Sequence, residues 1–369
     1  MNLLAELSEV SKVNLCKSFC EEYKKNPDTK IIIFGAGDGG MFAVAILTEN
    51  NMKPSYFCDN DVAKQGMLIK NTVVIAPEEI TNLAGNIMIL NTDSYRHEKE
   101  DQLLALGVDR RNIWSFDLFN PFYKKLTYDY LEKNRQKFEE VYAYLYDEYS
   151  KCVFLDYLKG ASSGDLSWYE KKVSKPEYFP EDIVPRLKNH IFLDVGAYNG
   201  NTIEEFISFT GNEYEKIYAF EPFLDSVKKI EDKSFPRVEV FSAAASNKCG
   251  EKTFYCNEYG DLTMVTTILE EGANHKALSF ATITIDEALH GRKATFIKMD
   301  IEGSELDALH GACRTIKKYK PFLAICVYHK REDLITILPY IESIVPEYRF
   351  YLRHHANTPS DLVLYCSCE

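Results

Sequence analysis

The chain has 369 residues, enough for two or three domains. Hydrophobic residues make up 46% and charged residues 27%, a globular composition that excludes a disordered chain. The net charge of −13 argues against a general nucleic-acid-binding protein, because phosphate contacts need a basic surface.

Targeting and redox signals are the next features that the sequence offers. The N-terminal residues lack the basic segment and long apolar run of a signal peptide, and no apolar stretch is long enough to span a membrane. The ten cysteines are scattered, with no CxxC pair. These observations predict a cytoplasmic protein with reduced thiols and no membrane span.

Strand-like and helix-like segments alternate through residues 30–118, after a short amphipathic helix within 1–29. This order predicts a parallel sheet with crossover helices. Strands are expected at 31–34, 55–59, 72–75 and 86–90, with a helix at 41–50.

A glycine-rich turn follows the first of these strands. Gly35, Gly37 and Gly40 fit G-x-G-x-x-G between a strand and a helix, and Asp59 ends the next strand. The segment resembles the small Rossmann-like domain that precedes several sugar-modifying enzymes, including sialic-acid-type acyltransferases. That resemblance implies that residues 1–118 bind a nucleotide or sugar nucleotide. A scaffold or dimerisation module is the alternative, and a homo-oligomer is left open.

Residues 119–189 are expected to form a helical bridge. Phe138, Tyr142, Leu145, Tyr149 and Cys152 recur at the spacing of one helical face. We interpret this aromatic stripe as core.

A second α/β alternation occupies residues 190–369. Its last two strands are close together in the sequence, as in a hairpin. The pattern predicts about seven strands, at 191–195, 216–220, 238–241, 295–300, 322–327, 349–352 and 362–365.

The strongest local motif follows the first strand of this region, at Asp194 to Thr202. Gly196 permits a sharp turn, and Gly200 permits close packing or a positive φ. Thr202 and Glu205 resemble a capping box that would open a helix at Ile203. Such a turn places backbone N–H groups beside a polar ligand.

The next three strand ends carry groups that suit a nucleoside. Glu221 ends the second strand, where a carboxylate can bind both hydroxyls of a ribose. Ala243 and Ala244 follow the third strand and leave a slot for a flat base. Asp300 ends the fourth strand at the same edge of the sheet.

Region 178–366 resembles the FkbM family of S-adenosylmethionine-dependent methyltransferases. The matching stretches are Tyr178-Phe179-Pro180, DVGAYNGNT at 194–202, AFEP at 219–222, TIDEAL at 284–289, IKMDIEGSE at 297–305, and 323–329. The resemblance implies a Rossmann-like seven-stranded class I methyltransferase sheet whose last pair is antiparallel, and O-methylation of sugars or other hydroxylated metabolites. The fold class expected for the chain is therefore α/β, with two Rossmann-like domains joined by the helical bridge. We expect the cofactor to contact Asp194, Gly196, Ala197, Tyr198, Gly200, Asn201, Thr202, Glu221, Pro222, Ala243, Ala244 and Asp300.

Methyl transfer to a hydroxyl needs the acceptor oxygen held in line and benefits from a nearby base. The candidate catalytic residues are His329, Asp300 and Lys298. Asp300 could instead contact the amino-acid end of the cofactor or bind a divalent metal, and the sequence leaves these roles open. Glu305 is expected to be structural, because a carboxylate near the N-terminus of a helix interacts favourably with the helix dipole. His354 and His355 are expected to be exposed or to face the substrate.

Two other functions remain open. One is an NAD-dependent sugar oxidoreductase or epimerase that uses the N-terminal glycine loop. The other is a cofactor-binding protein without catalytic activity. The net charge of −13 and the lack of an Asn-Pro-Pro-Tyr motif argue against a nucleic-acid methyltransferase.

Overall fold

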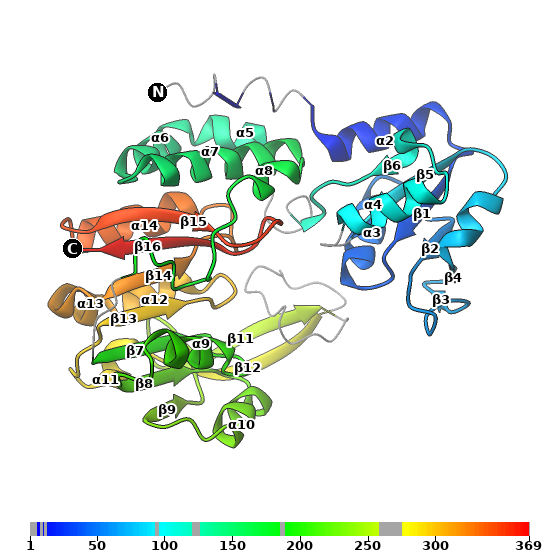
Figure 1. Cartoon of the computed structure of the whole chain (residues 1–369). Coiled ribbons are helices and arrows are strands. Elements are labelled where there is room, and N and C mark those ends of the chain that lie inside the picture. The colour runs from blue at the N-terminus through cyan, green and yellow to red at the C-terminus, as the bar shows by residue number, and fades with distance from the viewer. Residues whose placement is uncertain are drawn as a thin grey trace. The chain divides into compact units, whose positions relative to one another are not determined.

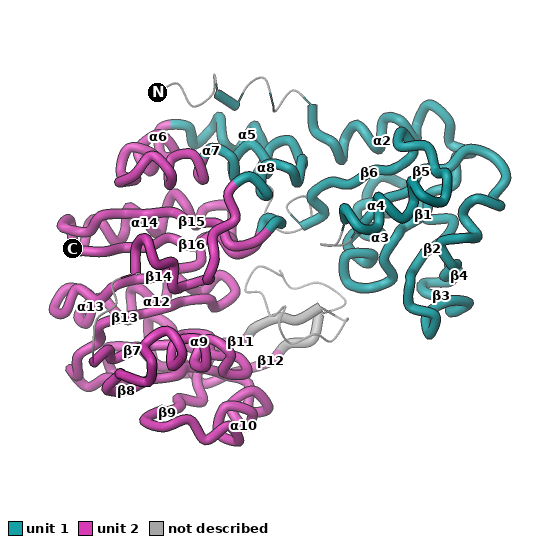
Figure 2. Tube along the Cα trace, in the orientation of Figure 1, with its two compact units in different colours: residues 1–135, 155–171, 357–359 teal, residues 136–154, 172–356, 360–369 magenta. Residues whose placement is uncertain are grey.

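The computed structural model describes residues 6–7, 10, 13–92, 96–119, 126–184, 189–257 and 275–368. The chain divides into two units, which Figure 2 shows in different colours. The N-terminal unit comprises residues 1–135, 155–171 and 357–359, and the C-terminal unit comprises 136–154, 172–356 and 360–369. The segment expected as a bridge is thus shared between the two units.

The N-terminal unit is built on a six-stranded sheet of order β3-β4-β2-β1-β5-β6. All neighbours are parallel except β3 and β4. The strands are β1 (Lys30–Phe34), β2 (Tyr56–Cys58), β3 (Leu68–Ile69), β4 (Thr72–Ile75), β5 (Ile87–Asn91) and β6 (Ile113–Trp114).

Helices cover both faces of this sheet. On β1, Ile31 and Ile33 pack in a cluster with Phe19 of α2 (Leu15–Lys25) and with α3 (Asp38–Glu49). The alternate residues, Ile32 and Phe34, pack on the other face with Leu103 of α4 (Arg96–Ala105). A strand buried on both faces explains the continuous apolar run in the sequence. The unit also contains η1 (Pro77–Asn82), η2 (Arg110–Asn112), α5 (Tyr128–Lys133) and α8 (Ser167–Glu170).

The C-terminal unit is built on a seven-stranded sheet of order β15-β16-β14-β13-β7-β8-β9 (Figure 1). Only β16 is antiparallel to its neighbours. The predicted α/β fold class and all seven expected strands are confirmed. They are β7 (His190–Val195), β8 (Tyr214–Phe220), β9 (Val238–Phe241), β13 (Phe296–Met299), β14 (Phe322–Cys326), β15 (Arg349–His354) and β16 (Leu362–Ser367).

The core on one face of this sheet is aromatic. Phe192 of β7 stacks on Phe206, with ring centroids 4.3 Å apart, and meets Phe296 of β13 at 5.3 Å. A second sheet of order β10-β12-β11 was not anticipated from the sequence. It contains β10 (Ala244–Ala245), β11 (Gly250–Asn257) and β12 (His275–Ile283). The remaining helices are α6 (Arg135–Tyr144), α7 (Glu148–Ser163), α9 (Asn201–Phe209), α10 (Leu224–Asp232), α11 (Ile285–Leu289), α12 (Glu305–Gly311), α13 (Cys313–Tyr319) and α14 (Asp333–Ile344).

Two local predictions are wrong. The stripe expected on one helical face is interrupted, because the chain leaves the helix after α6 and Leu145 forms a β-bridge with Phe350. Tyr149 and Cys152, beyond this break, are exposed rather than core.

His354 and His355, expected to be exposed or to face the substrate, are buried and do not line the cavity at the strand ends described below. His355 lies between the Ser174 carbonyl, 2.7 Å from Nδ1, and the Tyr365 hydroxyl, 2.8 Å from Nε2. Burial lowers the pKa of His355 to about 4. Within the described part of the chain, no helix has the length and apolar character needed to cross a membrane.

Candidate active site

The loop after β7 depends on glycine at two positions. Gly196 has φ +86°, and a Cβ there would collide with the Asp300 carbonyl. Gly200, at φ +83°, is the N-cap of α9 and packs against Phe235. The expected capping box is therefore wrong, because α9 begins before Thr202 and no side chain caps it.

Glu221, at the end of β8, is buried and holds this loop. Its Oε2 accepts the Tyr198 N–H at 2.8 Å, and its Oε1 accepts the Phe223 N–H at 2.9 Å. Burial raises the pKa of Glu221 to about 7, although these N–H donors lower it. Each carboxylate oxygen retains acceptor capacity for a ligand hydroxyl.

Lys298 and Asp194 form a buried ion pair between β13 and β7. The Lys298 Nζ lies 3.1 Å from Asp194 Oδ1 and donates to the Gly196 carbonyl at 2.7 Å. Burial would lower the pKa of Lys298, but Asp194 and Asp300 raise it above its usual value. These contacts connect Lys298 of β13 to Asp194 and to the loop after β7.

A cavity of about 270 Å³ lies at the carboxyl ends of the parallel strands. Its volume is near the lower end of the roughly 300–1,000 Å³ of small-molecule sites. The expected site residues that line it are Gly196, Tyr198, Glu221, Pro222, Ala244 and Asp300. The expected residues that do not line it are Asp194, Ala197, Gly200, Asn201, Thr202, Ala243, Lys298 and His329.

Several lining residues escaped the sequence reasoning. Phe223 and Phe280 meet with ring centroids 4.6 Å apart and form an apolar wall. Phe280 comes from β12 of the second sheet, so only knowledge of that sheet could have placed it here. Ile301, Glu302 and Ser304, in the turn after β13, also line the cavity. Their position directly after Asp300 in the sequence was the signal that could have placed them at the site.

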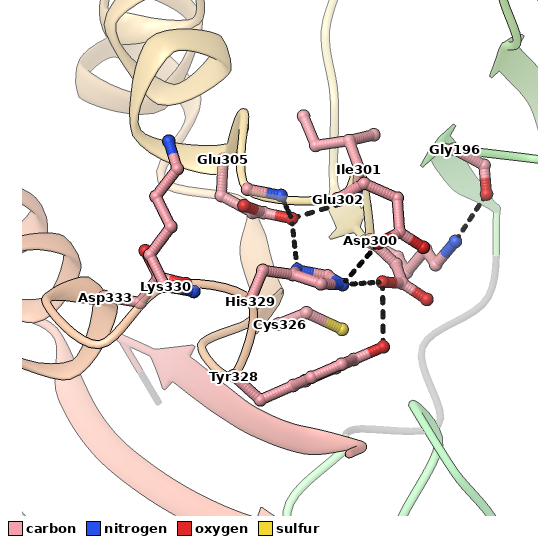
Figure 3. Close-up of polar contacts among 12 residues, drawn as sticks. Gly196, Asp300, Ile301, Glu302, Glu305, Cys326, Tyr328, His329, Lys330 and Asp333 are labelled. Atoms are coloured by element: carbon pink, nitrogen blue, oxygen red, sulfur yellow. Dashed lines mark hydrogen bonds and ion pairs between the residues drawn. The ribbon is translucent and has the colours of Figure 1, made fainter. Parts of the chain in front are cut away.

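The three residues Asp300, His329 and Glu305 come together beside this cavity (Figure 3). The His329 Nε2 lies 3.3 Å from Asp300 Oδ1, and its Nδ1 lies 2.9 Å from Glu305 Oε1. Asp300 also accepts the Tyr178 hydroxyl at 2.9 Å and the Tyr328 hydroxyl at 3.3 Å. The sequence analysis did not predict a role for either tyrosine.

In this cluster, neighbouring charges shift the pKa values of His329 and Asp300 in the direction opposite to that of burial. Burial would lower the pKa of His329, but Glu305 and Glu302 raise it to about 10. Burial would likewise raise the pKa of Asp300, but Lys298 and His329 lower it below its usual value. His329 is therefore protonated and Asp300 ionised at neutral pH when nothing else binds them.

The N-terminal glycine loop has a similar arrangement. Asp59 accepts the Ala36 N–H at 2.8 Å and lies 3.2 Å from the Lys64 ammonium. A Cβ on Gly40 would collide with the Gly35 carbonyl, whereas nothing lies within 4 Å of the position that a Cβ on Gly37 would take. A cavity of about 470 Å³ includes Gly35, Gly37, Asp59 and Lys64 but excludes Gly40.

Residues 194–357 match the family model of the methyltransferase FkbM domain. The match begins at Asp194 and includes Glu221, Lys298, Asp300, Glu305 and His329, whereas Tyr178 lies before it. Residues 27–114 match a second family model, described as C2185-like, N-terminal. This second match contains the N-terminal glycine loop and Asp59.

One solved structure that covers nearly the whole chain shares its fold. A methyltransferase FkbM from Methylobacillus flagellatus KT is 22% identical, covers 99% of this chain and 98% of its own, and superposes with a TM-score of 0.78. An rRNA methylase from Streptococcus thermophilus is 16% identical over 49% of this chain and 89% of its own, with a TM-score of 0.31. No curated protein matched the chain.

Proposed function

We propose that the C-terminal unit is an S-adenosylmethionine-dependent O-methyltransferase that acts on a hydroxyl of a sugar or related metabolite. The observation that carries the proposal is the cavity at the strand ends of the FkbM domain, where Glu221 and Asp300 face a common space. Ligands of open α/β sheets bind at this edge.

The residues present fit the cofactor. Glu221 can accept ribose hydroxyls, and Phe223 and Phe280 offer aromatic surface for a flat base. Carboxylates of Glu221, Asp300 and Glu302 line the cavity, and negative charge suits a ligand that carries ammonium and sulfonium groups. When bound, S-adenosylmethionine supplies an electrophilic methyl group.

The chain's own contribution is to position the acceptor. Asp300 is ionised and is fixed by the Tyr178 hydroxyl, so it can accept the hydrogen bond of an acceptor hydroxyl. His329 holds its proton near neutral pH and is a poor base in that state. Lys298 is engaged with Asp194 and Gly196, which assigns it to positioning the loop rather than to proton transfer.

We further propose that the N-terminal unit binds a nucleotide-linked acceptor. The open space at Gly37 and the carboxylate of Asp59 in one cavity support this role. Lys64 in the same cavity offers a cation for a phosphate group.

Calorimetric titration of the full chain with S-adenosylhomocysteine, and separately with NAD, tests these assignments. Glu221→Gln removes a charge but keeps the size of the side chain. We expect it to weaken S-adenosylhomocysteine binding by roughly 5- to 150-fold, the equivalent of about 1–3 kcal/mol for an unmatched buried polar group. Asp59→Ala and Glu239→Gln should leave that affinity unchanged. Glu239 is a half-buried carboxylate on β9 that pairs with Lys216 and does not line the cavity. Binding of NAD alone, lost in Asp59→Ala, would instead favour the oxidoreductase function.

A further inference from the structure

His329 occupies an unusual position among carboxylates. Its side chain is only 4% exposed, and its two ring nitrogens face different partners. The Nδ1 lies 2.9 Å from Glu305 Oε1, whereas the Nε2 lies 3.3 Å from Asp300 Oδ1 and 3.6 Å from Glu302 Oε2 (Figure 3). The Nε2 side of the ring is thus the side of the two residues that line the cavity.

The Nε2 of His329 lies near two carboxylates without forming a hydrogen bond to either of them. This nitrogen is fully buried and has no hydrogen-bond partner. Burying polar atoms without partners is costly, and such atoms call for an explanation. A bound ion on Nε2 would satisfy this atom and the carboxylates together.

The distances fit an ion. Donor atoms about 2.1 Å from a metal lie roughly 3.0–3.4 Å apart for right-angled to tetrahedral arrangements. The separations of 3.3 and 3.6 Å from Nε2 to Asp300 and Glu302 are close to that range. Glu305 is close to two of these donors, because donor atoms of Asp300, His329 and Glu305 lie within 4.8 Å of one another.

The surrounding groups fix the donors. Glu305 Oε1 accepts the Ile301 N–H at 2.9 Å, which anchors the carboxylate that faces Nδ1. The Tyr178 and Tyr328 hydroxyls donate to the two oxygens of Asp300. Metal sites commonly use such outer contacts, with a carboxylate on the far nitrogen of a ligating histidine.

We propose that His329 Nε2, Asp300 and Glu302 bind one divalent cation, with Glu305 as the positioning residue for the imidazole. One imidazole with two carboxylates favours an ion that accepts both nitrogen and oxygen ligands, such as Mn²⁺. Ion binding itself does not require the proposed methyltransferase function. The role of the ion does rest on that function, since an ion at the edge of the cavity would hold the acceptor hydroxyl through the hydroxyl oxygen.

Electron paramagnetic resonance of Mn²⁺, titrated into the chelator-treated full chain, tests the site. We expect one bound ion per chain. Asp300→Asn and Glu302→Gln should each weaken binding at least tenfold, and Glu305→Gln by about 10- to 100-fold. Asp307→Asn is the matched control, because this carboxylate lies on the same helix as Glu305 but pairs with Lys252. It should bind Mn²⁺ as the unmodified chain does.

The controls separate this proposal from the methyltransferase assignment. Glu302 is 41% exposed at its side chain, so Glu302→Gln is expected to fold, and circular dichroism checks this. A chain that binds S-adenosylhomocysteine but no Mn²⁺ would overturn the metal site and leave the proposed function intact. Mn²⁺ binding that is unchanged in both Asp300→Asn and Glu302→Gln would place the ion elsewhere and also overturn it. Mn²⁺ binding that these variants weaken, in a chain that binds no S-adenosylhomocysteine, would support the site and contradict the proposed function.

Discussion

Replacing Lys298 by methionine would leave the buried carboxylate of Asp194 without its ion-pair partner. The Lys298 side chain is 2% exposed and that of its partner, Asp194, is 0% exposed. Asp194 Oδ2 already has no hydrogen-bond partner. Lys298→Met therefore leaves the Asp194 carboxylate with no compensating charge, and also removes the hydrogen bond to the Gly196 carbonyl.

The expected loss is large. Removing one partner of a buried ion pair costs about 3–5 kcal/mol. In a domain of about 150–250 residues, that corresponds to a fall in Tm of roughly 6–20 °C. Asp194→Asn combined with Lys298→Met removes both charges, so we expect the double variant to recover at least half of the loss.

Thermal unfolding followed by circular dichroism measures these differences at pH 7 and pH 5. The isolated Asp194 carboxyl in Lys298→Met gains a pKa further above its unfolded value. Its penalty is present above the unfolded pKa and fades as the pH falls, so the single variant should be closest to the unmodified chain at pH 5. A fall in Tm below about 2 °C, or a double variant as unstable as the single one, would refute this account of the ion pair.

Three further predictions follow from the same unit. Gly196→Ala should lower the free energy of unfolding by at least about 1–3 kcal/mol and weaken S-adenosylhomocysteine binding, because the new Cβ would meet the Asp300 carbonyl. Gly211→Ala is the control: Gly211 has φ +58° and open space around it, so this variant should show only backbone strain and unchanged binding. The pKa of His355 is lowered to about 4, so stability should be lost as the pH falls below about 6.5, and His355→Gln should reduce that loss in urea unfolding. The pKa of Glu221 is raised to about 7, so its contribution has the opposite sign: stability should fall as the pH rises from about 4.5 to 7, and Glu221→Gln should flatten this slope.

The strands were predictable because their signal is local. Apolar runs such as 191–195 and 322–327 are buried on both faces of a parallel sheet. Such strands are apolar at nearly every position, so the sequence shows them as continuous hydrophobic runs. Strand ends were predictable for the same reason, which is how Glu221 and Asp300 were placed at one edge of the sheet. The register of the sheet then brings Asp194 and Lys298 to paired positions.

What escaped prediction depends on contacts between distant segments. Leu145 leaves the helical pattern because it pairs with Phe350, far along the chain. His355 is buried by a tyrosine of the neighbouring strand and by the Ser174 carbonyl, neither of which its own sequence neighbourhood contains. Phe280 reaches the cavity from a small sheet whose strands carry no distinctive period. Helical spacing and turn propensity are weak guides where tertiary contacts decide the backbone.

The two glycine loops show why an acidic residue after the second strand is an ambiguous signal. Asp59 accepts the Ala36 N–H and Glu221 accepts the Tyr198 N–H, so each carboxylate holds its own loop. The same residue type in the same place therefore has a structural role in both units, whether or not a ribose binds. A loss of ligand affinity in Glu221→Gln thus combines a loosened loop with a lost contact to the ligand. The two parts can be separated by stability, because a change confined to the ligand contact would lower affinity and leave the Tm of the ligand-free chain unchanged.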